Sequence, residues 1–550
     1  MTASVPRSLP PVRFILGAVL ILAAAVRLWG LDFGLPHTQA RPDETQVIDS
    51  ALSFLNGRLP RFYDYPWLYI WVLTLSYLAY YVYGLAAGSF HAVADVAASY
   101  ELHWEPFFMI SRALSAAAGT LTVYLVYRLA RQFWDSTTAL IAALFLALTF
   151  LAVRESHFGT TDAAMTMLIV AAVVLIIGAY RSGRPGRFAA AGIVAGLATA
   201  TKYNAVFVVV PFVVVQVLRS ADAPGRRMAT FFDRRLFLFG AGFAFALCLG
   251  IPFVILDWPR FSLAIRELIH STQHGMGNAR LEPGWIHHFK FSLRYGVGWP
   301  LLVSGLAAAA ALTAVQWRTA AIVLAFPVAY YAVAGSVGNL FVRYALPVVP
   351  FLCLTAAWGV TRTAAWIVRK RGDTRPLAGE AIAALLALAI ITPSIVSCWQ
   401  FDRIMAATDN RVVIANWFQQ SVPPGDSVLQ SGSSYGFVPL DDRIWIPWIW
   451  DRASQSFRVR GQPAAGRPDW ILLQESPLPS STQDIVKEFL KEDYQVAWQF
   501  TAFARGPARM YDLQDAFFVP YAGFQGVERP GPNFTLYRRA GPKSGNVPLS

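Results

Sequence analysis

The sequence predicts a polytopic α-helical membrane protein with about eleven transmembrane helices and a C-terminal soluble α/β domain. Of its 550 residues, 55% are hydrophobic and only 14% are charged, and the mean hydropathy is +0.44. The apolar residues come in blocks of roughly 17 to 25, each long enough to cross about 30 Å of hydrocarbon. At Trp399 the composition changes, and charges, prolines and turn signals become frequent. This pattern excludes an ordinary soluble enzyme.

Twelve apolar blocks are candidates for membrane spans. The second block, residues 66–88, carries two Trp and several Tyr, which prefer the headgroup level, so we predict that it lies flat on the membrane. Withdrawing it leaves about eleven spans. These are residues 12–31, 108–130, 137–154, 162–180, 187–203, 204–218, 234–254, 298–316, 318–336, 341–362 and 377–397.

The placement of Lys and Arg predicts the orientation. The formal charge is +13, and the arginines crowd the short loops between apolar blocks, which is the positive-inside pattern and not a nucleic-acid-binding face. With eleven spans each major cluster lies on the cytoplasmic side of a cell (inner) membrane. The N-terminus is then cytoplasmic and the C-terminal domain extracytoplasmic. The clusters are Arg181, Arg184 and Arg187; Arg226, Arg227, Arg234 and Arg235; and Arg369, Lys370, Arg371 and Arg375.

Two domains follow from this topology. Residues 1–398 form the membrane domain, with a first large outer loop at 31–107 and a second at 256–297. Residues 399–550 form the outer α/β domain. Within it we predict helices at 410–420 and 482–492 and strands at 427–430, 470–473 and 534–538. The three cysteines lie in or beside apolar spans, so they predict no disulfide framework.

The first outer loop opens with adjacent carboxylates, Asp43 and Glu44, just beyond the first span. Two interpretations stand. Pro42 suits the first turn of a helix, where acids complement the helix dipole. A carboxylate held at the interface can also take a proton from an acceptor hydroxyl while a lipid-borne donor is presented from the bilayer.

Ordered motifs give a resemblance to a known family. An apolar span is followed by RPDE, then FYDYPWLY, an Arg-led span (ISRALSAAAGTLTVYLVYRLAR), a turn ending TTDA, and TKYNAV. In this order they resemble the GT-C superfamily, and more narrowly the branch that holds protein O-mannosyltransferases and lipid A aminoarabinose transferases. The resemblance covers roughly residues 14–397, and it implies the GT-C fold and a transferase that uses a sugar carried on a polyprenyl phosphate.

The resemblance also assigns site residues. It implies that Asp43 is the base or acceptor-site carboxylate, with Glu44 as its neighbour. It matches Asp64, in FYDYP, to an acidic metal ligand of the aminoarabinose transferases. Here a single proline, Pro66, replaces the family's usual pair, which is a departure from the local pattern.

Charged residues at other outer turns are candidates for the same site. Asp162, at the mouth of the fourth span, either caps the following helix or acts at the membrane edge, and the two roles are compatible. Lys202 either snorkels to the headgroups or supplies a point charge for the carrier phosphate, which the resemblance favours. Arg343 and Tyr344 add a guanidinium fork and a hydroxyl to that phosphate site.

The second large loop holds four of the eight histidines. Histidines that are solvated or packed on aromatic rings explain them as well as a metal does. In metal-binding relatives a histidine from this loop completes the site, and the resemblance points to His274 beside Asp64. The sequence does not choose between Zn, Mn, Mg and no metal.

With the resemblance, these residues predict an integral membrane glycosyltransferase with an inverting single displacement. Asp43, Glu44 and Asp162 are its catalytic residues, and the acceptor is an extracytoplasmic protein, lipid or glycan. A transporter or flippase of lipid-linked sugars is the alternative, but the sequence lacks convincing inverted repeats and its acids lie in outer loops. A non-catalytic scaffold would leave the placement of Asp43, Asp162 and Lys202 unexplained.

Overall fold

The computed structural model describes residues 12–223, 225–274, 282–372, 375, 377–451, 453–478, 484–504, 506 and 508–540. The chain divides into two compact units. The first comprises Met1–Trp29 and Gln46–Trp399, and the second comprises Gly30–Thr45 and Gln400–Ser550. The start of the first outer loop therefore belongs to the same compact unit as the C-terminal part of the chain.

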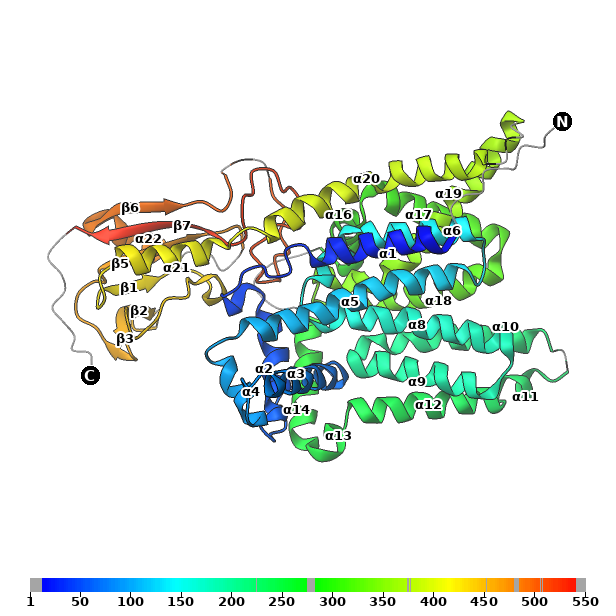
Figure 1. Ribbon diagram of the computed structural model, residues 1–550, viewed down its shortest axis with the longest axis horizontal. Coiled ribbons are helices and arrows are strands. Elements are labelled where there is room, and N and C mark those ends of the chain that lie inside the picture. The colour runs from blue at the N-terminus through cyan, green and yellow to red at the C-terminus, as the bar shows by residue number, and fades with distance from the viewer. Residues whose placement is uncertain are drawn as a thin grey trace. The chain divides into compact units, whose positions relative to one another are not determined.

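The first unit is a bundle of apolar helices that run side by side (Figure 1). Glycine allows some of them to approach closely: a Cβ at Gly192 would meet the carbonyl oxygen of Phe239 at 2.0 Å, so α9 and α12 pack backbone against backbone. The bundle helices are α1 (Val12–Leu28), α5 (Glu105–Ala130), α6 (Ser136–Leu148), α7 (Phe150–Ser156), α8 (Thr161–Ser182), α9 (Pro185–Thr201), α10 (Val209–Ala221), α12 (Arg234–Gly250), α17 (Trp299–Val315), α18 (Trp317–Ala334), α19 (Val349–Arg371) and α20 (Ala378–Met405).

Among the described residues, seven helices are long and apolar enough to cross a membrane, and nine if each of two bent helix pairs is one span. This number is below the eleven expected. Helices α1, α9 and α12 occupy predicted spans but have 17 residues each, which is about 26 Å of helix against about 30 Å of hydrocarbon. The chain is a multi-pass membrane protein.

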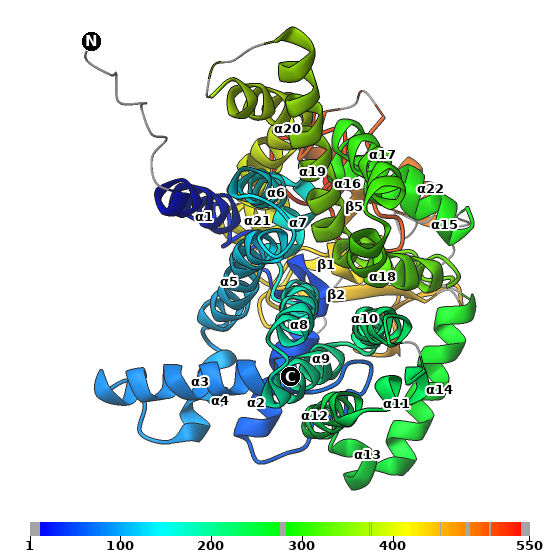
Figure 2. The ribbon, with the colours of Figure 1, turned by 90° about the vertical axis from the view of Figure 1, so that its right-hand side faces the viewer.

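Helix α3 (Leu68–Ala86) meets the same length and hydropathy requirements but lies across the bundle. Figure 2 looks along the bundle helices and shows α3 and α14 (Trp258–His274) from the side. This direction agrees with the prediction that residues 66–88 lie flat on the membrane. Shorter helices in these connections are α2 (Pro42–Leu55), α4 (Val93–Tyr100), α11 (Arg227–Phe231), α13 (Phe253–Leu256), α15 (Gly284–His287) and α16 (Arg294–Val297), with a π-helical turn, η3 (His288–Leu293), between the last two.

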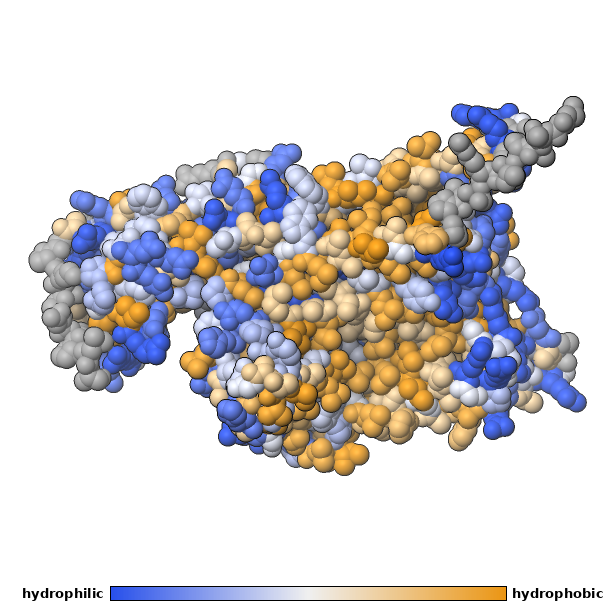
Figure 3. All heavy atoms as spheres, viewed as in Figure 1, coloured by the Kyte–Doolittle hydropathy of each residue, from blue (hydrophilic) through white to orange (hydrophobic). Residues whose placement is uncertain are grey.

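The arginine clusters gather at one end of the bundle. This end of the bundle contains the last turns of α8 and α19, the first turn of α9, and α11 (Figure 1). In Figure 3 it is hydrophilic, and hydrophobic residues cover the helices beside it. The structure thus joins the predicted cytoplasmic loops into one basic face.

Two predicted spans are broken by a sharp bend. Helices α6 and α7 meet at an angle of 57° around Thr149. The bend frees carbonyl groups at the end of α6, and buried Arg27 donates to two of them, Leu146 O at 3.3 Å and Ala147 O at 3.0 Å. The second break, of 114°, falls at Gly298, whose φ of +85° favours glycine.

The second unit contains a seven-stranded sheet in the order β4-β3-β2-β1-β5-β7-β6. Strand β1 pairs in parallel with β2 and β5, and the outer pairs are antiparallel. The strands are β1 (Ser427–Gln430), β2 (Ile446–Asp451), β3 (Ser456–Val459), β4 (Gln462–Pro463), β5 (Trp470–Glu475), β6 (Tyr494–Phe500) and β7 (Asn533–Arg539).

Side chains alternate across this sheet, so each face has its own core. Leu472 of β5 packs with Ile414 and Phe418 of α21 (Asn410–Ser421) on one face. Ile471 packs with Val486 of α22 (Asp484–Asp493) on the other. The predicted helices and strands of this unit are confirmed where they fall on described residues. Residues 482 and 483, the first two of the predicted helix 482–492, lie outside the described residues. The sequence did not predict β2, β3, β4 or β6.

Candidate active site

Asp162, Lys202 and Arg343 come together in the first unit. Lys202 Nζ donates to Asp162 Oδ1 at 2.7 Å, and Arg343 Nε lies 4.0 Å from Asp162 Oδ2. All three residues are buried, with 1%, 6% and 5% of their surface exposed. Lys202 and Arg343, which lie 40 and 181 residues after Asp162 in the sequence, thus meet around its carboxylate.

Each of these residues lies where a helix begins or ends. Asp162 is in the first turn of α8, whose N-cap is Thr160, so Asp162 is not the cap that the sequence allowed. Lys202 has extended backbone between α9 and the 3₁₀ helix η2 (Tyr203–Val208). Arg343 lies in the 3₁₀ helix η4 (Val342–Val348), which precedes α19. Breaks in helical geometry therefore direct polar side chains inward at one level of the bundle.

Aromatic rings surround the two cations. The rings of Tyr65 and Tyr344 each lie with their centroid 5.2 Å from Lys202 Nζ, and the Arg343 guanidinium lies 4.1 Å from the Phe341 ring centroid. Cations over aromatic faces are stabilised where water is scarce. The cluster places two positive charges around one carboxylate, an excess that suits an anionic group such as a phosphate.

A second buried charge pair lies nearby in the chain. Arg154 Nη1 and Glu155 Oε1, both in α7, form a hydrogen-bonded ion pair with 1% and 0% of their side chains exposed. Glu155 was not predicted as a site residue, because the sequence RES between an apolar run and a glycine turn also fits a surface loop. His157 contacts the carbonyl oxygens of Val153 and Trp29, each at 3.0 Å.

Asp43 and Glu44 lie in the second unit, in the first turn of α2. Arg41 has a fully buried side chain that is ion-paired with Asp515, and its Nη2 lies 3.6 Å from Asp43 Oδ2. The side chain of Asp43 is 36% exposed, whereas Glu44 is fully buried. Asp43 is thus the accessible member of the pair. Arg41, which positions it, was not predicted.

Asp64 lies in the segment that contacts the Lys202 turn, since its neighbour Tyr65 faces Lys202 and Tyr203 donates to the carbonyl oxygen of Tyr63 at 3.0 Å. Partial burial of its carboxyl group and repulsion from Glu267 raise the pKa of Asp64. His274 is the last residue of α14, and its side chain lies outside the described residues. Within the described part of the chain, no group of three or more His, Cys, Asp and Glu is placed to hold a metal ion.

A second polar cluster lies in the second unit. Burial, and then the nearby Arg411 guanidinium, lower the pKa of His37 to about 3. Its Nδ1 accepts a hydrogen bond from Gln39 N at 3.2 Å. Arg411 in turn binds buried Asp409 through Nε at 2.9 Å and Nη2 at 2.6 Å. Burial alone would raise the pKa of Asp409, but the charge and the hydrogen bonds of Arg411 outweigh this effect and lower it.

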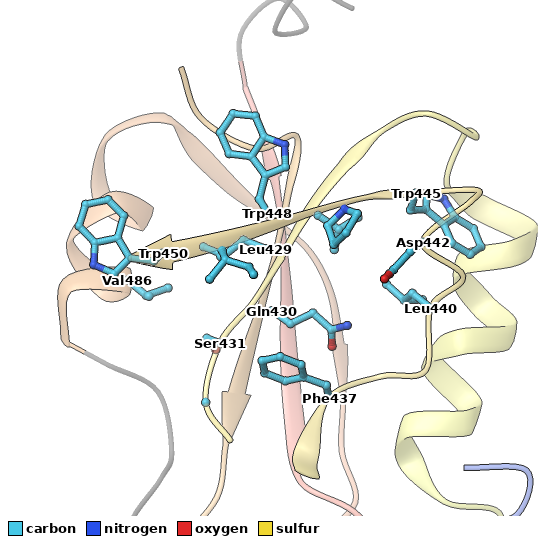
Figure 4. Close-up of a pocket in the computed structure, with 14 residues that line it drawn as sticks. Leu429, Gln430, Ser431, Phe437, Leu440, Asp442, Trp445, Trp448, Trp450 and Val486 are labelled. Atoms are coloured by element: carbon cyan, nitrogen blue, oxygen red, sulfur yellow. The ribbon is translucent and has the colours of Figure 1, made fainter. Parts of the chain in front are cut away.

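The second unit also has a cavity of about 400 Å³ beside the carboxyl end of β1. Figure 4 shows Trp450 and Asp442 on opposite sides of it, with Phe437 below Gln430. Gln430 fixes the wall, because its side-chain amide donates to Val438 O at 2.9 Å and accepts from Val438 N at 2.7 Å. Ligands commonly bind at the carboxyl ends of parallel strands.

Known proteins resemble this chain in sequence over one segment and in fold over almost its whole length. Residues 108–255, just over a quarter of the chain, match the family described as dolichyl-phosphate-mannose-protein mannosyltransferase. No curated protein sequence matches. The chain is similar in structure to apo ArnT from Cupriavidus metallidurans, with 14% identity and a TM-score of 0.54 over 96% of this chain and 99% of that one.

Two further solved structures are similar. ArnT from Cupriavidus metallidurans bound to undecaprenyl phosphate has 13% identity and a TM-score of 0.51, over 96% of this chain and 97% of that one. The apo oligosaccharyltransferase of Archaeoglobus fulgidus has 13% identity and a TM-score of 0.47 over 75% of this chain, which spans 58% of that protein's length. The match of residues 108–255 to a mannosyltransferase family and the ArnT-like fold of the chain are the two findings that relate this protein to membrane glycosyltransferases.

Proposed function

We propose that this protein transfers a sugar from a polyprenyl phosphate to an acceptor on the extracytoplasmic side of the membrane. The observation that carries the proposal is the convergence of Lys202 and Arg343 on Asp162 at the end of the bundle opposite the arginine clusters. The ArnT structure with undecaprenyl phosphate, which has this fold, makes a lipid phosphate the first ligand to test.

The cations would stabilise the leaving group. When the bond between the anomeric carbon and the phosphate oxygen breaks, negative charge develops on the polyprenyl phosphate. Lys202 and Arg343, buried and preorganised, offer an ammonium and a guanidinium to that charge without reorganising. Tyr344 faces Lys202 and would donate its hydroxyl to the same phosphate. Asp162 holds both cations in place before the donor arrives.

Asp43 would be the base. Its carboxylate is accessible, and a carboxylate in reach of an acceptor hydroxyl can act as a general base. The acceptor hydroxyl or amine loses its proton to Asp43 and attacks the anomeric carbon, and the polyprenyl phosphate leaves from the opposite face. One displacement of this kind inverts the anomeric configuration. Glu44, fully buried in the same turn, would support Asp43.

A divalent metal would bind beside Asp64. Glu267 is near enough for its charge to raise the pKa of Asp64, and carboxylate oxygens are the donors that such ions prefer. Asp64 and His274 would hold the ion, and a bound ion would add positive charge near the phosphate. Lys202 and Arg343 supply the charge stabilisation that the proposed displacement needs.

The second unit would hold the acceptor. Its 400 Å³ cavity combines indole surfaces with one carboxylate, Asp442, at the rim. Flat apolar rings with a nearby hydrogen-bond acceptor suit a carbohydrate or another amphipathic group. The basic face of the bundle would be cytoplasmic, so the Asp162 site, at the other end of the bundle, would be extracytoplasmic. Eleven spans from a cytoplasmic N-terminus would also make the C-terminal domain extracytoplasmic.

The test is a transfer assay with the detergent-purified full chain, radiolabelled polyprenyl phosphate sugars and a cell-envelope extract. We expect wild type to move label from lipid to an acceptor, Asp43→Asn to lose transfer, and Asp32→Asn to keep it. Asp32 is a suitable control because it is an exposed carboxylate in the same Gly30–Thr45 segment. Transfer by Asp43→Asn would remove the base assignment, and carrier binding without any product would favour a transporter.

A further inference from the structure

Four arginines converge on one open cavity at the basic end of the bundle. Arg128 and Arg131 come from the end of α5, Arg181 from the end of α8 and Arg187 from the start of α9, and together with Gln132 they line about 470 Å³. No carboxylate lines this cavity. Within the described part of the chain, none of the four forms an ion pair.

Helix stability does not explain the whole set. Arg128 and Arg181 lie in the last turns of their helices, where a cation complements the helix dipole. Arg187 lies in the first turn of α9, which begins at Pro185, and there a positive charge opposes the dipole. Asp135, four residues after Arg131 in the sequence, caps α6 by accepting a hydrogen bond from Thr138 N at 2.8 Å. An external anion is therefore the missing partner of this cavity.

A polar group beside the arginines narrows the class of anion. Gln132 donates through Nε2 to Val174 O at 2.9 Å, which fixes the orientation of its amide. Its Oε1 is buried without a hydrogen-bond partner among the described residues. A buried acceptor of this kind requires a donor. The ligand should thus carry a hydroxyl or similar donor next to its negative charge.

The surroundings favour a lipid over a free anion. Leu121 lies seven residues before Arg128 on α5, so both share one face, and Leu121 is 47% exposed on the apolar part of the helix. Phe133 and Trp134 follow the cavity at the end of α5, where aromatic rings mark the headgroup level. A headgroup in the cavity would therefore continue into acyl chains along α5.

We propose that this cavity binds the phosphoglycerol headgroup of an anionic phospholipid in the cytoplasmic leaflet. The four guanidinium groups bind the phosphate, and a glycerol hydroxyl donates to Gln132 Oε1. This site is separate from the Asp162 cluster and independent of the transferase reaction. The bound lipid would hold the ends of α5, α8 and α9 together.

The test is native mass spectrometry of the delipidated full chain, titrated with phosphatidylglycerol in mixed micelles. We expect R131Q/R187Q to lose roughly 25-fold in apparent affinity, at about 1 kcal/mol for each arginine. The matched control is R226Q/R227Q, which removes two exposed arginines from the same end. Equal losses in both variants would overturn the proposal, because binding would then follow the overall charge. Tryptophan fluorescence checks folding, and R187Q alone serves if the double variant unfolds.

Two further arms identify the ligand. Inorganic phosphate at millimolar concentration should not displace the lipid, and phosphatidylcholine should bind far more weakly; the opposite result in either arm overturns the lipid assignment. Gln132→Leu should weaken phosphatidylglycerol but leave phosphatidic acid, which lacks the glycerol hydroxyls, unchanged. Equal weakening of both lipids would overturn the assignment of the glycerol contact.

Discussion

Lys202 Nζ lies 2.7 Å from Asp162 Oδ1, and this bond joins the end of α9 to the start of α8 in a buried site. Asp162 and Lys202 are charged residues buried among apolar helices, and each neutralises part of the other's charge. Arg343, 4.0 Å from the second oxygen of the same carboxylate, brings a second cation to the cluster. Its predicted ligand is accordingly an anion.

Replacing Lys202 with methionine should abolish most of the transfer activity. The variant removes one charge from the developing phosphate, and loss of one such donor typically costs about 10²–10³ in kcat. It also leaves Asp162 buried with only Arg343 nearby in the cluster, so we expect lower stability. Lys202→Arg, which keeps the charge, is the control. Full activity in Lys202→Met, measured by single-turnover transfer, would contradict the proposed phosphate site.

Replacing Asp515 with alanine should destabilise the second unit by about 3–5 kcal/mol, because it takes the carboxylate from the buried guanidinium of Arg41. Denaturant unfolding followed by tryptophan fluorescence measures this loss. Asp441→Ala breaks an exposed ion pair with Arg443 and should change the unfolding midpoint little. Similar midpoints for the two variants would show that the Arg41 pair contributes nothing to folding.

His37 should make the stability of the second unit depend on pH. Its pKa falls from 6.5 to about 3 on folding, so below pH 6.5 the unfolded chain binds a proton that the folded chain does not. Stability is therefore full above pH 6.5 and decreases towards pH 3, by about 1.4 kcal/mol for each pH unit. Unfolding at pH 7.5 and 5 measures it. His37→Gln should remove the loss in this range, whereas the Asp409 contribution declines at lower pH, near the ordinary carboxyl pKa of 3.8.

Patterns within a short stretch of chain predicted most of the fold. The strands at Ser427 and Trp470 are apolar runs bounded by turn residues, and the structure starts β1 and β5 at these residues. Strand β2 was not predicted because Pro447 interrupts its run IPWIWD. The structure tolerates Pro447 because β2 pairs with β3 only from Trp448 onward.

Contacts between distant residues could not be predicted. The sequence placed Asp162, Lys202 and Arg343 at outer turns, since topology decides which loops share a side of the membrane. It gave no sign of Arg41, because an arginine before Pro42 is an ordinary start for a helix, and its partner Asp515 lies 474 residues away. Burial of such a pair depends on how the first outer loop packs with the C-terminal part of the chain.

Replacing Trp450 with alanine should weaken acceptor use without changing donor use. Trp450 lines the 400 Å³ cavity and packs edge-on against Phe457, with ring centroids 4.9 Å apart. If the acceptor lies against this indole, its loss should raise the acceptor KM about tenfold, which corresponds to about 1.4 kcal/mol, while the donor KM stays constant. Trp498→Ala is the matched control, because Trp498 is 53% exposed in the same sheet and does not line the cavity. Equal acceptor KM values for the two variants would exclude the cavity from acceptor binding. A rise in donor KM would instead assign Trp450 to donor recognition.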